Sequence, residues 1–188
     1  MQLKSKLKFI PKNYDKFTMV LNKLKKIKLL LLDVDGVLTD GNIIYNDNGA
    51  ETKVFNVKDG LGIRLLMEAG IHLGIVTGRR SNALYSRCKD LGIDLIYDGI
   101  GNKVDVLDAL LDQTGASAEE VAFIGDDLPD LALMKMIGLS IAVGDAHHSI
   151  IDNADMVTSA KGGDGAVREA CEAILKAKGL WEDILEHF

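Results

Sequence analysis

The apolar run Leu29–Leu32, followed at once by Asp33 and Asp35, limits the possible folds of this chain more than any other segment. Four consecutive leucines are typical of a strand that is covered on both faces, as in a parallel sheet between layers of helices. Ionised aspartate is costly to remove from water, so packing alone does not explain two of them at the end of such a strand. Side chains at positions i and i+2 of a strand point the same way. The pair therefore predicts a cation site, a phosphoryl-transfer site, or both.

Strand-like apolar runs alternate with helical patterns along the rest of the chain. Strands are predicted at residues 28–34, 71–77, 95–97, 121–125, 139–143 and 156–158. Helices are predicted at residues 62–69, 82–91, 103–114, 131–137 and 166–177. This alternation predicts a Rossmann-like α/β domain, with helices on both faces of a parallel sheet. A chain of 188 residues suits one such domain, and no stretch is long enough to form a separate cap domain.

Residues 42–57 break the alternation and predict a β-hairpin inserted after the first strand. Asn48 and Gly49 supply the positive φ angles that a tight turn needs. The isoleucines, tyrosine, valines and phenylalanine of the segment are more apolar than a lone hairpin tolerates, because exposed apolar strands associate with other chains. We therefore predict that the hairpin is an oligomer contact. The alternative is that it folds back onto its own sheet.

Charge is distributed unevenly along the chain. Residues 1–28 hold nine lysines and one acid, Asp15, for a net charge of +8; since the whole chain carries −6, the remainder carries −14. We expect residues 1–27 to be a basic, solvated extension, residues 28–178 to be the α/β domain and residues 179–188 to be a C-terminal tail. The acidic balance argues against nucleic acid as the main partner.

No targeting or membrane segment is evident from the sequence. The basic N-terminal stretch lacks the apolar centre and the small-residue cleavage site of a signal peptide. No apolar run approaches the ~20 residues that a membrane span needs. Cys88 and Cys171 lie far apart within helical patterns, so buried or half-buried thiols are expected. A cytoplasmic protein without a membrane partner is therefore expected.

Polar groups follow several of the predicted strands. In open α/β sheets, ligands bind beyond the carboxyl ends of the strands. Thr77, Gly78 and Arg79 follow the second main strand, and Lys103 opens a helix. An acidic cluster follows the third main strand and comprises Asp126, Asp127 and Asp130. Together with Asp33 and Asp35, these groups are predicted to meet at one edge of the sheet.

This set of groups has the composition of a phosphoryl-transfer site. Carboxylates and a backbone carbonyl suit Mg²⁺, which would neutralise Asp33 and a substrate phosphate together. A carboxylate can attack phosphorus, Thr77 and Lys103 can hold phosphoryl oxygens, and Asp35 can serve as general acid and then general base. Each motif alone has a plainer interpretation, such as a surface turn, a solvated lysine or a helix cap. Their joint occurrence, each after an apolar strand, favours catalysis.

The same four motifs resemble those of the haloacid dehalogenase (HAD) phosphohydrolases, over residues ~28–178 and in the same order. The resemblance implies that Asp33 is the nucleophile and forms an aspartyl-phosphate. It implies that Asp35 protonates the leaving oxygen, activates water and gives Mg²⁺ its carbonyl, while Asp33 and Asp126 are the carboxylate ligands. Thr77 and Lys103 would stabilise the phosphoryl group. Two further acids would support the metal ligands without binding the ion, namely Asp127 and Asp130.

Three further segments resemble 3-deoxy-D-manno-octulosonate 8-phosphate (KDO 8-phosphate) phosphatases, a capless family. They are Phe55–Arg64, Val143–His147 and Gly162–Glu169. The resemblance implies hydrolysis of KDO 8-phosphate in lipopolysaccharide precursor synthesis. It also implies a homotetramer in which the hairpins assemble at the centre and neighbouring subunits close each active site. The Gly-rich segment 162–165 and the C-terminal residues would help to exclude water, although residues 180–188 do not match the family pattern.

Substrate contacts are expected from several cations near the site. Arg79 would bind phosphate or the sugar carboxylate beside the backbone of Gly78, and Arg64 and Lys58 would bind the sugar acid from this or a neighbouring subunit. Asp59 is expected to cap the helix that follows Gly60.

The same residues are also compatible with three other functions. The same chemistry could act on a nonulosonate 9-phosphate, which has one more carbon. A phosphorylation-switched receiver domain uses similar groups, but it must keep its phospho-aspartate, whereas Asp35 would help to hydrolyse it. A catalytically silent assembly module built around the hairpin is a third interpretation.

Overall fold

A six-stranded parallel sheet forms the centre of the protein, for which a computed structural model describes residues 14–188. The strand order is β5-β4-β1-β6-β7-β8. The strands are β1 (Leu29–Leu32), β4 (His72–Val76), β5 (Leu95–Tyr97), β6 (Val121–Gly125), β7 (Leu139–Ala142) and β8 (Met156–Val157). Every pair in this sheet is parallel. The predicted Rossmann-like sheet is confirmed.

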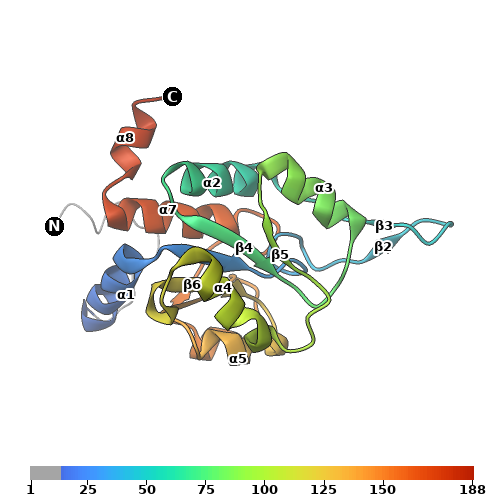
Figure 1. Ribbon diagram of the computed structural model, residues 1–188, viewed down its shortest axis with the longest axis horizontal. Helices are drawn as coiled ribbons and strands as arrows, with labels where there is room; N and C mark the ends of the chain where they lie inside the picture. Colours follow the sequence, from blue (N-terminus) through green and yellow to red (C-terminus); the bar gives the residue numbers. More distant parts are fainter. Residues whose placement is uncertain (1–13) are drawn as a thin grey trace.

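Helices cover both faces of the sheet. On one face lie α2 (Val57–Glu68), α3 (Asn82–Leu91) and α7 (Ala166–Lys178), and on the other lie α4 (Leu107–Thr114) and α5 (Leu131–Met134) (Figure 1). The remaining helices are α1 (Tyr14–Lys26), α6 (His148–Asn153) and α8 (Trp181–Leu185). Short 3₁₀ turns are η1 (Lys103–Val106), η2 (Ala118–Glu120) and η3 (Leu128–Asp130). Among the described residues, no helix combines the length and apolar character that a bilayer span requires.

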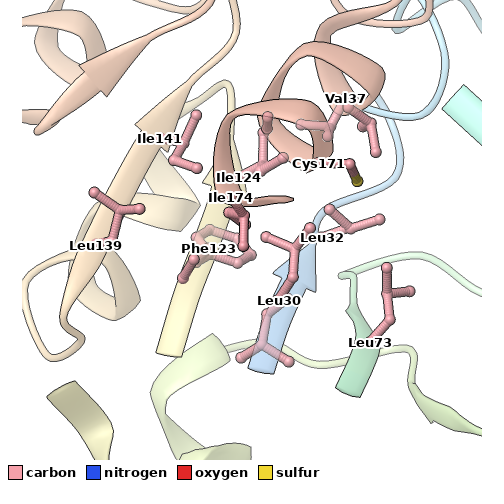
Figure 2. Packing of buried hydrophobic residues seen from close by; sticks show 14 of the residues in the cluster. Leu30, Leu32, Val37, Leu73, Phe123, Ile124, Leu139, Ile141, Cys171 and Ile174 are labelled. Carbon is pink, nitrogen blue, oxygen red and sulfur yellow. The ribbon is translucent and has the colours of Figure 1, made fainter. Parts of the chain in front are cut away.

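The core is centred on β1, whose four leucines are completely buried. Strand β1 lies between β4 and β6, with Leu30 beside Leu73 on one side and Ala122 on the other. Figure 2 shows Cys171 and Ile174 of α7 above these strands. Cys171 is a buried thiol, as predicted, and burial raises its pKa well above the usual range. The buried strand β1 therefore fixes the position of the loop that follows it, which carries Asp33 and Asp35.

The N-terminal segment differs from the expected solvated extension. Residues 14–26 form the amphipathic helix α1, and Phe17, Val20 and Leu24 on one face of it are buried. That face packs against α7, while Lys23 Nζ lies 2.6 Å from Asp155 Oδ1. Lysines dominate the composition of the segment, but they lie on the outer face of the helix. The net charge therefore gave no indication of the apolar residues that recur with helical period on the other face. Residues 1–13 of the predicted extension lie outside the described part of the chain.

Replacing Leu24 with Ala is expected to lower the free energy of unfolding by about 2–5 kcal/mol, because Leu24 is 2% exposed and its loss leaves a cavity. The matched control is Lys25→Ala on the exposed face of the same helix, for which a change within about 0.5 kcal/mol is expected. Urea denaturation of both variants measures the difference. Equal stabilities would show that α1 contributes nothing to the fold.

The inserted hairpin forms a two-stranded sheet separate from the main one. Antiparallel strands β2 (Ile44–Tyr45) and β3 (Glu51–Thr52) project from the body of the molecule (Figure 1). The turn between them is held by Asn46, whose side chain accepts hydrogen bonds from the backbone of Asn48 and Ala50. The hairpin does not fold back onto the main sheet. Several of its apolar side chains remain exposed, with Ile44 at 48%, Tyr45 at 60% and Val54 at 66%.

The C-terminal helix α8 packs against α7 of the same chain. The Trp181 ring lies beside two cations of α7, with its centroid 4.9 Å from Lys176 Nζ and 5.6 Å from Arg168 Cζ. Glu172 forms ion pairs with both cations, and both cations make cation–π contacts with the Trp181 ring. Figure 1 places the C-terminus at the end of the molecule opposite to the hairpin.

Candidate active site at the carboxyl edge of the sheet

The contact between Asp33 and Lys103 forms the centre of the site. Asp33 directly follows β1, and its backbone N–H donates to the carbonyl of Ile124 at 3.0 Å. Lys103 begins η1, and its side chain is only 4% exposed. Its Nζ lies 2.8 Å from Asp33 Oδ1 and 2.5 Å from Asp130 Oδ1. Three residues from loops that are far apart in the sequence are thus brought together, as predicted.

Asp130 organises the acidic loop after β6. It is 1% exposed, and its Oδ2 accepts hydrogen bonds from the backbone N–H groups of Asp126 at 2.8 Å and Asp127 at 3.2 Å. Asp127 itself is exposed and caps η3 by accepting from the N–H of Leu128 at 2.8 Å. Because Lys103 contacts the other oxygen of Asp130, both oxygens of this carboxylate are engaged, one by the loop backbone and one by the lysine.

The carboxylate of Asp126 lies against the loop that follows the nucleophile candidate. A Cβ atom on Gly36 would lie 2.1 Å from Asp126 Oδ2, and Gly36 has a φ of +89°, so only glycine fits there without displacement. Oxygen atoms of Asp33, Asp126 and Asp130 all lie within 4.8 Å of one another. Since both oxygens of Asp130 are engaged, Asp33 and Asp126 are the carboxylates available to a cation.

The electrostatics of this cluster fit a divalent cation. Burial, together with the charges of Asp33 and Asp130, raises the pKa of Asp126 to about 8. Burial raises the pKa of Asp33 to about 6, although Lys103 opposes the shift. For Lys103, burial lowers the pKa, but the two neighbouring carboxylates outweigh it and the net shift is upward. Three acids around one lysine leave excess negative charge among oxygen donors, which suits Mg²⁺.

Without a divalent cation, the stability of the protein is expected to fall as the pH rises from about 4 to about 8. The pKa values of Asp33 and Asp126 are raised from 3.8 to about 6 and about 8, so folding favours their protonated forms. The resulting stability is fully present below the unfolded pKa and is lost as the pH passes the folded values. Mg²⁺ should bind the ionised carboxylates and therefore raise Tm more at pH 8 than at pH 6.

Thermal denaturation in EDTA and in MgCl₂ across this pH range tests the prediction. The control is Asp126→Asn, which should show both a flatter pH dependence and a smaller Mg²⁺ effect. A Mg²⁺ shift of Tm that does not depend on pH, or one that the substitution leaves intact, would contradict the assignment of this cation site.

Thr77 lies at the carboxyl end of β4, next to the Asp33 loop. It is 2% exposed, and the backbone of Leu32 pairs with Ile75, so residue 77 aligns with the segment between Asp33 and Asp35. Its backbone N–H donates to Tyr97 O at 2.9 Å, and its carbonyl accepts from Ile100 N at 3.1 Å. Gly78 follows it and is exposed. Two backbone hydrogen bonds thus hold Thr77 in place beside the loop of the nucleophile candidate.

The side chain of Asp35 makes its ion pairs with the hairpin and with the loop after β4. Lys53 Nζ pairs with Asp35 Oδ1, and Arg79 Nε lies 3.5 Å from Asp35 Oδ2. Glu51 binds both cations, at 2.7 Å from Lys53 and 2.8 Å from Arg79. Sequence reasoning missed Glu51 and Lys53. The signal was there: two charged residues at i and i+2 in an apolar hairpin share a face of the strand.

The Gly-rich segment packs directly on the Asp33 loop. A Cβ on Gly162 would lie 1.7 Å from the carbonyl oxygen of Gly36, and the N–H of Gly163 donates to Val37 O at 2.9 Å. The Asn56 side chain donates to the carbonyl of Gly163 at 3.2 Å. The segment therefore joins the hairpin exit to the loop that carries Asp33 and Asp35.

Asp59 has a different role from the predicted one. It accepts hydrogen bonds from the N–H groups of Gly165 at 3.3 Å and Arg168 at 2.7 Å, so it caps α7 rather than its own helix. The N-cap of α2 is Asn56, which accepts from Lys58 N at 2.8 Å. The reason is tertiary: Asp59 is buried against the start of α7, and this burial raises its pKa.

The two cations proposed for the sugar acid lie away from the cluster in this chain. The Arg64 guanidinium donates to the carbonyl of Asp90 at 3.2 Å, near the end of α3. Lys58 is exposed in the first turn of α2. Within residues 14–188, neither is recorded in an ion pair or hydrogen bond with Asp33, Asp126 or Lys103. The backbone of His147, by contrast, braces the acidic loop by donating to Asp126 O at 2.7 Å.

Comparisons with known proteins agree with this geometry. A family model described as haloacid dehalogenase-like hydrolase matches residues 95–169. A 3-deoxy-D-manno-octulosonate 8-phosphate phosphatase of Salmonella typhi is 48% identical over 166 residues, which cover 88% of each chain. The solved structure of the phosphatase of that name from Yersinia pestis has a TM-score of 0.86 at 45% identity, covering 87% of this chain and 89% of that one.

A second solved structure carries ligands. The 3-deoxy-D-manno-octulosonate 8-phosphate phosphatase of Moraxella catarrhalis, in complex with magnesium ion, phosphate ion and KDO, has a TM-score of 0.87 at 44% identity. The match covers 90% of this chain and 97% of that one. Identity of this level over most of both chains shows that this chain belongs to the 3-deoxy-D-manno-octulosonate 8-phosphate phosphatases, a family of the haloacid dehalogenase-like hydrolases.

Proposed function

We propose that this protein is a Mg²⁺-dependent phosphomonoesterase that hydrolyses KDO 8-phosphate to KDO and inorganic phosphate. The observation that carries the proposal is the contact of Lys103 with both Asp33 and Asp130 beside Asp126, at the carboxyl edge of the sheet. The curated relatives bear the name of this activity, and one similar solved structure holds magnesium, phosphate and KDO. These names favour the eight-carbon substrate over a nonulosonate 9-phosphate or a receiver-domain function.

The first chemical step is attack on phosphorus by a carboxylate oxygen of Asp33. A bond forms between that oxygen and phosphorus, the ester bond to the sugar breaks, and Asp35 gives its proton to the leaving oxygen. Lys103 stays charged because its acidic neighbours raise its pKa, and it stabilises the phosphoryl oxygens with Thr77. When bound by Asp33, Asp126 and the carbonyl of Asp35, Mg²⁺ supplies the positive charge that screens carboxylate from phosphate.

The second step returns the enzyme to its starting state. Water attacks the phosphorus of the aspartyl-phosphate, Asp35 takes its proton, and the bond between phosphorus and Asp33 breaks. Asp130 takes no direct part but keeps Lys103 and the backbone of Asp126 and Asp127 in place. The side chain of Asp35 pairs with Lys53 and Arg79 and is not one of the three grouped carboxylates, which supports its assignment to proton transfer.

Cations around the site are proposed to bind the sugar acid. Arg79 lies beside Asp35 with its side chain 39% exposed, so it is accessible to a phosphate or carboxylate next to the backbone of Gly78. Arg64 and Lys58 are proposed to reach the substrate of a neighbouring subunit, because they do not reach the cluster of their own chain. Arg64→Gln and Lys58→Gln should then raise KM while leaving kcat largely unchanged; an unchanged KM would remove them from the substrate site.

A homotetramer assembled through the hairpins is proposed on the basis of their exposed apolar residues. Exposed apolar strands on a projecting hairpin are expected to be covered by other copies of the chain. Light scattering at micromolar concentration tests this, with the hairpin variant Ile44→Ser as the comparison. A monomeric wild-type protein would contradict the proposal.

A phosphate-release screen over sugar phosphates, with and without Mg²⁺, tests the proposed activity. We expect KDO 8-phosphate to be hydrolysed faster than a nonulosonate 9-phosphate and expect EDTA to stop the reaction. No release from any ester in the presence of Mg²⁺ would contradict the proposed function.

A further inference from the structure

Lys53 is a buried charge on an exposed hairpin. It directly follows β3, and its neighbours Thr52 and Val54 are exposed, yet its own side chain is only 2% exposed. Its ammonium group contacts Asp35 Oδ1 and lies 2.7 Å from Glu51 Oε1. A lysine loses hydration and rotamer freedom when it is buried, so its place here depends on these two carboxylates.

Four charged groups form a closed ring at this point. Lys53 links Asp35 to Glu51, Glu51 Oε2 accepts from Arg79 Nη2 at 2.8 Å, and Arg79 Nε lies 3.5 Å from Asp35 Oδ2. Acids and bases alternate, and the ring joins three elements: the loop after β1, the hairpin and the loop after β4. Arg79 also donates to the hydroxyl of Tyr45 at 3.3 Å. Ion pairs thus connect the hairpin to Asp35, directly through Lys53 and indirectly through Glu51 and Arg79.

The two carboxylate oxygens of Asp35 have different surroundings. Oδ1 is held by Lys53, whereas Oδ2 is buried, accepts no hydrogen bond from the described residues and has only the long 3.5 Å approach of Arg79 Nε as an ion-pair contact. A buried carboxylate oxygen without a hydrogen bond is costly, and such an atom calls for an explanation. Because both oxygens belong to one planar group, a contact that fixes Oδ1 also fixes the direction of Oδ2. Of the two oxygens, Oδ2 is the more weakly held and makes no hydrogen bond within the described part of the protein, so it is the one that can exchange a proton with a substrate.

We infer that Lys53 is a positioning residue for the proton-transfer step: it holds Asp35 Oδ1 so that Oδ2 is directed to the reacting oxygen, and Glu51 holds Lys53. This inference deepens the proposed function and rests on it, since it requires Asp35 to act as acid and base. Lys53 acts through Asp35 and need not touch the substrate. The hairpin then contributes to catalysis within its own chain, apart from any role in assembly.

Two esters that differ in leaving group test this inference. KDO 8-phosphate releases a poor leaving group that needs a proton, whereas 4-nitrophenyl phosphate releases a good one that does not. For Lys53→Gln, kcat/KM for the sugar phosphate is expected to fall about 10²-fold, the lower end of the contribution of general acid–base catalysis, and to fall much less for the aryl ester. Lys53→Arg should recover most of the loss, and Glu51→Gln should show the same pattern more weakly.

Controls separate this inference from simpler explanations. Lys89→Gln removes an exposed lysine of α3 and should match the wild type with both esters. Melting temperatures of the Lys53 and Glu51 variants report whether they fold. An equal loss with both esters, a loss confined to KM for the sugar acid, or no loss at all would each overturn the inference. Wild-type protein that releases phosphate from neither ester would instead overturn the proposed function, and this assay comes first.

Discussion

Asp33→Asn is expected to lower kcat by at least about 10⁴-fold, because an amide nitrogen or oxygen cannot form the aspartyl-phosphate on which both steps depend. Lys103 and the acidic loop stay in place, so the loss should appear in turnover and not in the fold. Phosphate release from KDO 8-phosphate in Mg²⁺ gives kcat, and thermal denaturation gives Tm. The metal-free variant should be no less stable than the wild type near neutral pH, since burial disfavours the ionised form of Asp33 and raises its pKa to about 6.

The matched control for this substitution is Asp112→Asn, which makes the same chemical change at an exposed position of α4. Its activity and Tm should equal those of the wild type within error. Activity retained by Asp33→Asn would exclude Asp33 as the nucleophile. A collapse of its Tm would show instead that the residue serves the fold.

Lys103→Met is expected to damage both stability and activity. The substitution leaves Asp130 Oδ1 and Asp33 Oδ1 without their cation at a place where Asp130 is 1% exposed. Removing one member of a buried ion pair costs about 3–5 kcal/mol of unfolding free energy. Loss of a cation directed at the phosphoryl oxygens should also lower kcat by about 10²–10³-fold. Urea denaturation and phosphate release measure the two effects separately.

Two further variants show whether the cost comes from the unpaired acids. The exposed Lys89→Met should behave as the wild type in both assays. The double variant Lys103→Met with Asp130→Asn should recover part of the lost stability, because the buried carboxylate is removed with its partner. If Lys103→Met is as stable and active as Lys89→Met, the buried network has no role in folding or catalysis.

The sequence predicts the groups at the sheet edge well because their positions follow from local patterns. A short apolar run such as Leu29–Leu32, in a chain where such runs alternate with helical patterns, favours a buried central strand, and parallel strands place their carboxyl ends together. Asp33, Thr77 and Asp126 each follow such a strand directly. To predict that these residues lie close together, it is therefore enough to assign the strands and to know that they run parallel.

The contacts of Asp35, Asp59 and the N-terminal helix could not be predicted from the sequence, because they depend on how separate elements pack against one another. Which cation meets Asp35 depends on how far the hairpin bends over the β1 loop, and no spacing in the chain states that Lys53 approaches it. Asp59 sits in the first turn of α2, where a cap is the ordinary expectation, but the approach of α7 redirects it. For α1, abundant lysines obscured the apolar stripe that includes Leu24.

Covalent capture on Asp33 tests the central claim most directly. Wild-type protein is mixed with KDO 8-phosphate and Mg²⁺, quenched in acid during turnover, digested and analysed by mass spectrometry, with Asp33→Asn treated in the same way. We expect the mass of one phosphoryl group on the wild-type peptide that contains Asp33, and none on the variant. Full turnover with no phosphorylated peptide, or with the phosphoryl group on another residue, would contradict a reaction that passes through Asp33.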